Sequence, residues 1–245
     1  MEEYRFHKYN SGNIRTAVKN AKNIILPLGA IEAHADHLTL DTDNVLVEYY
    51  AKQLAKNTES LVLPILNYGA VWSLSEAPGS IDTKLRPLID FIKNIVLSLD
   101  KNGAKMVTLV SAHFGNIDAC KIAAREIFDV SDIKVVYLTY PNIKKYLDIF
   151  DVVNNHNLYL HACEVETSMM LYIDEINVDM KKAKRGIIDV PKTTGYTPTK
   201  WTEFTDTFIM GDARKSNKDK GKLIFEKIIR DASNIINLEK ERLND

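Results

Sequence analysis

Four short apolar segments, each separated from the next by an amphipathic segment, constrain the fold of this chain most strongly. The apolar segments are residues 23–29, 61–66, 106–110 and 134–139. Between them, apolar residues recur at helical spacing in residues 42–54, 85–99 and 117–128. Continuous apolar runs that alternate with helices are typical of parallel strands buried on both faces. We therefore predict an α/β fold, a three-layer sandwich in which helices flank a mostly parallel central sheet.

The last third of the chain is less regular. Residues 164–173 and 218–243 have helical spacing, and the second segment is long and amphipathic enough to be a closing helix. Residues 189–208 are rich in Thr, Pro, Gly and aromatic side chains, which indicates a long ordered loop or a hairpin. The sequence has no internal repeat, low-complexity tract or obvious linker. We expect residues 1–245 to form a single domain.

Charge and composition bear on the partners and the compartment of the protein. The chain has 32 Lys and Arg against 33 Asp and Glu, so it lacks the basic field that holds nucleic acids. No apolar run approaches the roughly 18 residues that a membrane-spanning helix needs, and the first ten residues lack an apolar signal core. Two cysteines cannot build a disulfide framework. We expect a cytoplasmic protein without nucleic-acid or membrane partners.

An acidic, histidine-containing segment follows the first apolar run. Glu, His or Asp occupies six of the twelve positions in residues 32–43. In an extended chain Glu32, His34 and Asp36 would point to one side, because side chains alternate along a strand. Imidazole and carboxylate together suit zinc, iron or manganese. This composition favours a metal site, although a solvated acidic loop is the simpler alternative.

A second polar cluster, residues 111–116, follows the third apolar run. His113 lies there at a strand-to-helix turn, Gly115 permits a tight backbone, and Asn116 is a plausible N-cap of the next helix. A lone histidine at a strand end is more often structural than ligating. Because the carboxyl ends of parallel strands meet at one edge of a sheet, however, we expect His113 to converge with the acidic segment.

A third cluster, residues 161–168, supplies His161, Glu164 and Glu166. His161 and Glu166 can face the same site if the helix starts after His161, whereas Glu164 has a simpler reading as a charge near a helix N-terminus. Together the three clusters predict a binuclear hydrolytic centre, in which a metal-activated hydroxide attacks a carbonyl. A serine hydrolase is less favoured, because Ser111 is not in a Gly-x-Ser-x-Gly setting.

The same segments resemble the creatininase family of amidohydrolases. The segments LGAIEAHADHLTLDTD, SAHFGN and HACEVETS resemble three of its motifs. APGSI at residues 77–81 and MGDARKSNKDKG at residues 210–221 resemble two more, and all five occur in order. The resemblance implies an α/β sandwich with a parallel sheet, one or two divalent ions at the strand ends, and a homo-oligomer that in many members is a hexamer.

The resemblance also implies roles for individual residues. The residues implied as metal ligands are Glu32, His34, Asp43, His113 and Glu166. Asp43 would bridge two ions. His161 would lie in the substrate pocket as a proton carrier or carbonyl partner, and either it or Glu166 would help to protonate the leaving nitrogen.

Departures from the family pattern indicate an altered pocket. Creatininase itself has a metal-binding Glu where this chain has Gly115, which argues against creatinine as the substrate. In the first loop Ala35 replaces the usual Gly and Asp36 the usual Pro. The residues predicted to bind substrate are Trp72, Phe114 and Gly115, with Tyr196 and Trp201 as further aromatic candidates.

We therefore predict a metal-dependent amidohydrolase that uses two divalent ions per chain, of zinc, iron or manganese. Its substrate would be a small non-peptide amide, either a cyclic amide or a formamide. Two alternatives remain open. One is a non-catalytic, metal-stabilised assembly or binding subunit, which the substituted first loop motivates. The other is a peptide-processing member of the same family.

Overall fold

A parallel four-stranded sheet forms the centre of the molecule. The computed structural model describes residues 3–156 and 159–243. The strands are β1 (Ile24–Leu28), β2 (Leu61–Val62), β3 (Met106–Ser111) and β4 (Lys134–Leu138). Their order is β2-β1-β3-β4, and every neighbouring pair is parallel. The predicted parallel sheet is confirmed.

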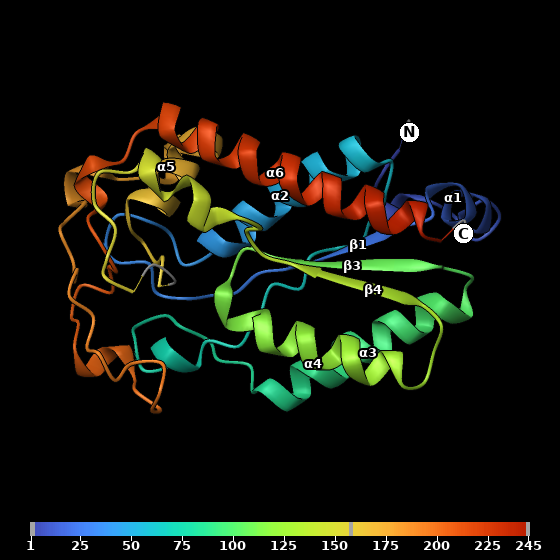
Figure 1. Cartoon of the computed structure of the whole chain (residues 1–245), viewed down its shortest axis with the longest axis horizontal. Helices are drawn as coiled ribbons and strands as arrows, with labels where there is room; N and C mark the ends of the chain where they lie inside the picture. The colour runs from blue at the N-terminus through green and yellow to red at the C-terminus, as the bar shows by residue number, and fades with distance from the viewer. Residues whose placement is uncertain (1–2, 157–158, 244–245) are drawn as a thin grey trace.

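Helices cover both faces of this sheet (Figure 1). One face carries α2 (Thr42–Thr58), α5 (Glu164–Ile173) and α6 (Lys218–Glu241). The other carries α3 (Leu85–Lys101) and α4 (Ile117–Phe128), and α1 (Ile14–Ala21) packs into the same core at one end. The strands are buried on both sides, so each face of the sheet has its own hydrophobic core. The three-layer sandwich is therefore confirmed.

Most predicted elements agree with the structure, and the exceptions have local causes. The helices predicted at 117–128 and 164–173 are α4 and α5 with the same bounds. Strand β2 ends at Val62 rather than residue 66, because Pro64 has no N–H for the ladder. Beyond β2 the pairing continues through backbone hydrogen bonds and one bridge between Leu28 and Leu66. Helix α1 was not predicted, because it is only eight residues long and half of its residues are polar.

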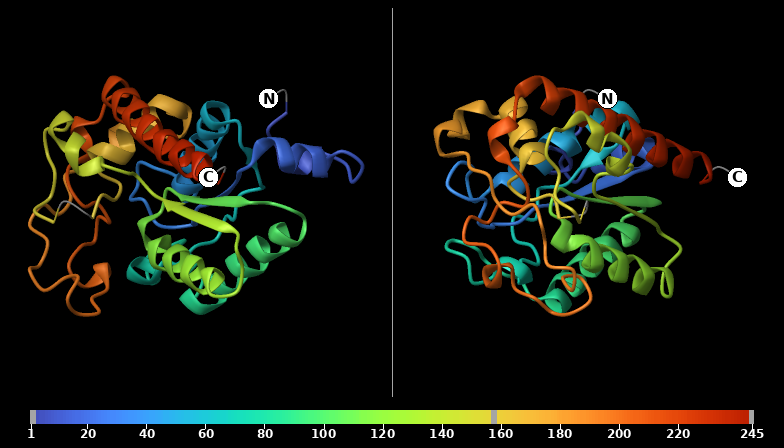
Figure 2. Two further views of the ribbon diagram at one scale, coloured as in Figure 1. Left: turned by 45° about the vertical axis from the view of Figure 1, so that its right-hand side comes forward. Right: turned by 60° about the vertical axis from the view of Figure 1, so that its left-hand side comes forward.

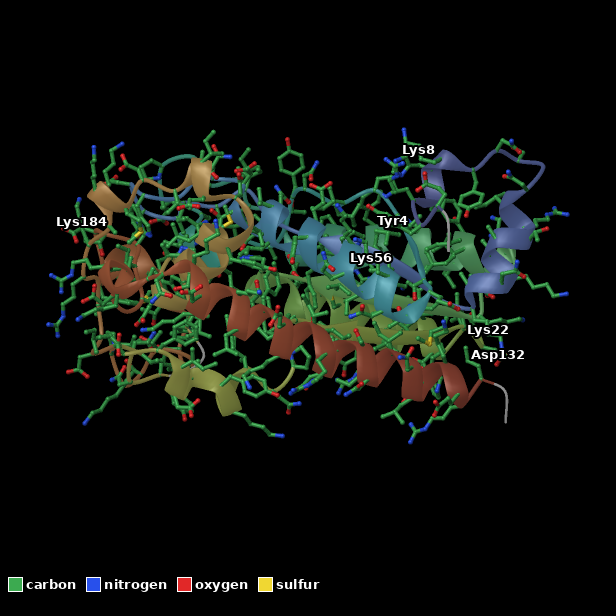
Figure 3. The ribbon with its side chains drawn as sticks, turned by 90° about the horizontal axis from the view of Figure 1, so that it is seen from above. Tyr4, Lys8, Lys22, Lys56, Asp132 and Lys184 are labelled. Carbon is green, nitrogen blue, oxygen red and sulfur yellow. The ribbon has the colours of Figure 1, made fainter. Side chains whose placement is uncertain are left out.

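The segment 189–208, all of which the structure describes, is a loop rather than a hairpin. It contains one short 3-10 turn, Trp201–Glu203, and one bridge between Thr194 and Thr197. This orange segment gathers with the other loops at one end of the molecule (Figure 2). Lys184 also lies at that end, whereas Lys22 and Asp132, which precede β1 and β4, lie at the opposite end (Figure 3). The loops therefore collect at the carboxyl ends of the strands.

No helix within residues 3–156 and 159–243 is long and apolar enough to cross a membrane.

Candidate metal centre and adjoining pocket

Six acidic and imidazole side chains converge at the carboxyl end of the sheet, and each is at most 7% exposed. They are Glu32, His34, Asp43, His113, His161 and Glu166. They form three overlapping groups that could hold a metal ion, with the ligand atoms of each group within 4.8 Å of one another. We call these six residues the carboxylate–imidazole cluster. The structure thus brings together every residue for which the sequence predicts a metal or catalytic role.

Local backbone contacts bring the first acidic segment into the cluster. The Glu32 N–H donates to the Leu40 carbonyl at 3.0 Å and closes the segment into a loop. The Thr42 hydroxyl donates to the Thr39 carbonyl at 2.7 Å where α2 begins. These bonds place Glu32 next to the first turn of α2, which carries Asp43. Glu32 and Asp43, eleven residues apart in the sequence, therefore face one another.

Asp36 does not belong to the cluster. Ala35 has a left-handed φ of 61°, which turns the chain and ends the alternation of an extended segment. Asp36 consequently points outward and forms an exposed ion pair with Lys184 at 2.9 Å. The expectation that Glu32, His34 and Asp36 share one side is therefore wrong for Asp36.

Each of the three clustered imidazoles is oriented by one backbone carbonyl. Nε2 of His113 lies 2.9 Å from the Ala70 carbonyl, and Nε2 of His161 lies 2.8 Å from the Ala33 carbonyl. Nδ1 of His34 lies 3.0 Å from the carbonyl of Glu32. A carbonyl oxygen can only accept, so each of these nitrogens carries the proton. The other ring nitrogen of each histidine is left to face the carboxylates.

The free nitrogens meet carboxylate oxygens at distances that leave room for a cation. Nδ1 of His113 lies 3.1 Å from Asp43 Oδ2 and 3.3 Å from Glu32 Oε2. Nε2 of His34 lies 3.7 Å from Asp43 Oδ1. The two oxygens of Asp43 thus face two different imidazoles. Among the described residues, His34 Nε2 is buried and has no hydrogen-bond partner, so it is free to bind a cation.

The pKa values of the clustered residues also indicate that positive charge is favoured there. Burial opposes charge on His113, but Glu32 and Asp43 outweigh it and hold the pKa of His113 well above its ordinary value. Burial raises the pKa of Glu166 to about 8. Both raised pKa values mean that His113 and Glu166 hold their protons, so positive charge between the buried carboxylates is favoured. A mixed set of carboxylate and imidazole donors fits a divalent zinc, iron or manganese ion.

A cavity of about 290 Å³ opens directly beside the cluster. The three residues predicted to bind substrate, Trp72, Phe114 and Gly115, all line it. Trp201 lines it too, whereas Tyr196 is 90% exposed and lies outside the lining. Tyr159 and Thr194 also line the cavity. Neither residue was predicted from the sequence, because distant loops bring them there without a local motif.

Aromatic contacts join the loop 189–208 to this cavity. The ring of Trp201 lies 5.4 Å from that of His161 and 5.4 Å from that of Tyr159. Beside it, the Lys200 ammonium donates to the Trp72 carbonyl at 2.5 Å and lies 4.3 Å from the Trp72 ring. The loop is thus fixed to the opposite wall, and aromatic rings enclose the space in front of His161.

Gly115 is confined by its neighbours. A Cβ atom at this position would lie 2.2 Å from the Ala70 carbonyl oxygen and 2.3 Å from His113 Nε2. Both distances are far below van der Waals contact. The backbone here therefore leaves no room for a side chain at residue 115.

Glu164 and His37, whose roles the sequence left open, support the cluster from outside. Glu164 is fully buried and accepts from the N–H groups of Asp151 and Val152 at 3.0 and 3.1 Å. It also accepts from the Lys220 ammonium at 2.5 Å. His37 Nε2 lies 2.9 Å from the hydroxyl of Thr167, the residue after Glu166. The hydrogen bonds of Glu164 and His37 thus hold the backbone next to the clustered residues in place.

The sequence matches one family model and is similar to two known hydrolases. The family model for creatininase, described as creatinine amidohydrolase, matches residues 7–236. The creatinine amidohydrolase of Pseudomonas putida is 25% identical over 240 residues, which cover 88% of this chain and 89% of that protein. A 3-dehydro-scyllo-inosose hydrolase of Thermotoga maritima is 25% identical over 171 residues, or 68% of this chain and 55% of that protein.

Solved structures show the same fold. A creatininase crystal structure superimposes with a TM-score of 0.82 at 21% identity, and the match covers 98% of both chains. A creatininase structure described as a manganese form superimposes with a TM-score of 0.81 at 22% identity, over 97% of this chain and 98% of that one. Because the family model spans nearly the whole sequence and its motif residues meet in one buried cluster, the chain belongs to the creatininase family.

Proposed function

We propose that this chain is a metal-dependent amidohydrolase that cleaves a small non-peptide amide, either a cyclic amide or a formamide, and that residues 1–245 act as one domain. The observation that carries the proposal is the position of Asp43. Its two carboxylate oxygens face two different imidazoles inside a buried cluster. A cavity large enough for a small molecule opens at this cluster.

The donor set divides into two halves that share Asp43. Glu32, Asp43 and His113 would hold one ion, and His34, Asp43 and Glu166 the other. Zinc, iron and manganese all suit these donors. When bound, such ions supply Lewis-acid activation of an amide carbonyl and of a water molecule.

His161 is suited to move the proton that the leaving nitrogen needs. Its Nε2 is held by the Ala33 carbonyl, and the ring lines the cavity next to Trp201. Burial, and then the neighbouring His34, lower the pKa of His161 to about 4, so its imidazole is neutral near pH 7. Glu166 also lines the cavity and is the second candidate for this transfer. Trp72 and Phe114 would confine a flat amide against the cluster.

The first test is turnover of a panel of lactams and N-formyl amines by protein loaded with zinc, manganese or iron(II). We expect hydrolysis by the wild type, and loss of both metal and hydrolysis in Asp43→Asn. Asp41→Asn is the matched control, because Asp41 lies two residues away on the exposed side and outside the cluster. Full hydrolysis by Asp43→Asn would contradict the mechanism.

His161→Gln separates proton transfer from metal binding. We expect kcat to fall by a factor of about 10² to 10⁴, which is the usual contribution of general acid–base catalysis. Metal content should stay at the wild-type level, because the five proposed ligands are intact. Equal loss of metal and activity would instead assign His161 to the ligands.

The alternative functions make different predictions for the same panel. A metal-stabilised assembly or binding subunit would retain metal and hydrolyse nothing, and a peptide-processing enzyme would cleave peptides but no small amide. We also propose a homo-oligomer, with a hexamer as the first candidate, and sedimentation of the full chain measures its size directly.

A further inference from the structure

The side chain of Asn116 is fully buried, and it does not act as the helix N-cap predicted from the sequence. It occupies the N-cap position of α4, yet its side chain makes no capping hydrogen bond. Instead its Oδ1 accepts from the Ala70 N–H at 2.9 Å, and its Nδ2 donates to the Gly29 carbonyl at 3.0 Å and to the Ser111 hydroxyl at 3.1 Å. One amide thus ties together the ends of β1 and β3 and the segment that contains Ala70.

Ala70 is also the residue that orients His113. Its N–H is held by Asn116, and its carbonyl accepts from His113 Nε2 at 2.9 Å. Ser111, the third partner of Asn116, bonds to both the N–H and the carbonyl of His113, at 3.1 and 2.9 Å. Asn116 therefore contacts both supports of His113, one for the imidazole and one for the backbone.

Glycines on both sides of Ala70 allow the close approach of Asn116 and His113. A Cβ atom on Gly69 would lie 2.6 Å from Asn116 Oδ1. On the other side of Ala70, a Cβ atom on Gly115 would lie 2.2 Å from the Ala70 carbonyl oxygen. Two glycines therefore allow Asn116 and the His113 ring to close on Ala70 from both sides.

We propose that Asn116 is a positioning residue that, through Ala70 and Ser111, directs Nδ1 of His113 toward Glu32 and Asp43. It thereby sets the metal affinity of the Glu32–Asp43–His113 half of the cluster and leaves the His34–Asp43–Glu166 half unaffected. The inference rests on the proposed metal centre. Partners that orient a metal-binding imidazole typically contribute a factor of 10 to 100 in metal affinity.

Asn23 provides a matched control at the other end of the sheet. It is also buried, with Nδ2 donating to the Ser60 hydroxyl at 2.8 Å and Oδ1 accepting from the Thr108 hydroxyl at 3.0 Å. It immediately precedes β1, whereas Asn116 follows β3. Asn23→Ala therefore removes a comparable buried network without touching the cluster.

The experiment titrates Zn²⁺ into the metal-free full chain by calorimetry, for the wild type, Asn116→Ala, Asn116→Asp and Asn23→Ala. In Asn116→Ala we expect one of two binding events to weaken 10- to 100-fold and the other to stay within a factor of about two. Asn116→Asp keeps the acceptor for Ala70 and should weaken that event less, while Asn23→Ala should bind as the wild type does. Unchanged binding in Asn116→Ala, or equal loss at both events, would overturn the inference.

A second readout needs no metal. In protein labelled with ¹⁵N-histidine, the Nε2–H resonance of His113 should exchange slowly in the wild type and Asn23→Ala, and faster in both Asn116 variants. If the wild type binds no metal, the proposed function fails, but this resonance still tests whether Asn116 positions His113. An equally slow resonance in the Asn116 variants would overturn that role.

Discussion

At the scale of single residues, backbone conformation decides which side chains enter the cluster. Ala35 and Ala162, with φ of 61° and 48°, adopt left-handed conformations that favour glycine. Each lies next to a clustered histidine, His34 or His161. A non-glycine residue in this region costs roughly 1–2 kcal/mol. This backbone strain occurs where the chain turns beside the cluster.

Ala35→Gly should therefore stabilise the protein by about 0.5–1 kcal/mol, since glycine adopts this φ without strain. Urea unfolding of the metal-free chain measures the change. Ala17, half-buried in α1 at an ordinary helical φ, is the matched control, and Ala17→Gly should cost about 1 kcal/mol. Destabilisation by both substitutions would contradict the assignment of strain to Ala35.

Gly115→Ala should weaken metal binding, because the added methyl group overlaps both the Ala70 carbonyl and His113 Nε2. The expected result is loss of metal from the Glu32–Asp43–His113 half, detected as a fall in metal content per chain. Gly103→Ala is the control for a lost glycine, since a Cβ there meets no atom within 4 Å. Retention of full metal content by Gly115→Ala would show that the turn can relax.

Residue types, spacing and the family resemblance together predicted which side chains would meet, but not how they are supported. Glu32, His34 and His113 were predictable because parallel strands end at one edge. The link from Asn116 to Ala70 was not, because the partner is a backbone group of a segment without any motif. The outward direction of Asp36 was not predicted, because it depends on the left-handed φ of Ala35, and an alanine in the sequence does not indicate such a conformation.

At the scale of elements, one buried ion pair joins the helices that carry and cover the site. Lys220 in the first turn of α6 contacts Glu164, the first residue of α5, and Asp151 in the loop that precedes α5. The Glu164 side chain is fully buried and that of Lys220 is 20% exposed. Removing the ammonium would leave a buried carboxylate without its counter-charge.

Lys220→Met should therefore destabilise the protein by about 3 kcal/mol near pH 8, the usual cost of breaking a buried pair. Burial lowers the pKa of Lys220, but hydrogen bonds to Asp151 and Glu164 outweigh it and raise the pKa above 10.5. The folded chain thus binds this proton more tightly than the unfolded chain. The contribution is complete below pH 10.5 and is lost as the pH rises through the folded pKa.

Urea unfolding of the wild type and Lys220→Met across this pH range measures the difference. It should be largest at pH 8 and shrink above pH 10.5. Lys222, the next lysine along α6, has an exposed side chain 3.9 Å from Glu226, and Lys222→Met should change stability by less than about 0.5 kcal/mol. A wild-type advantage that grows with alkaline pH would contradict this account.

Alternating apolar and amphipathic segments predicted the elements well, because burial on both faces leaves an uninterrupted apolar run. The shortening of β2 was not predicted, although Pro64 is visible in the sequence, because a proline is tolerated at sheet edges and strand ends. The strand order β2-β1-β3-β4 depends on which crossovers pack, and periodicity carries no such information.

At the scale of the whole molecule, the proposed metal centre connects segments from residue 32 to residue 166. Metal should therefore stabilise the fold as a whole. An ion present at one hundred times its Kd adds about 2.7 kcal/mol for one site. We expect the Tm of the wild type to rise with added Zn²⁺ and that of Asp43→Asn to stay constant. Equal shifts in both proteins would assign the effect to other sites.

The most direct test of the metal centre is the metal content per chain of protein purified without oxygen. Elemental analysis should find about two ions of zinc, iron or manganese in the wild type and in Asp41→Asn, and none in Asp43→Asn. A wild type that takes up no metal would contradict the central claim. So would an Asp43→Asn variant that retains both ions, because Asp43 is the residue that the two halves of the cluster share.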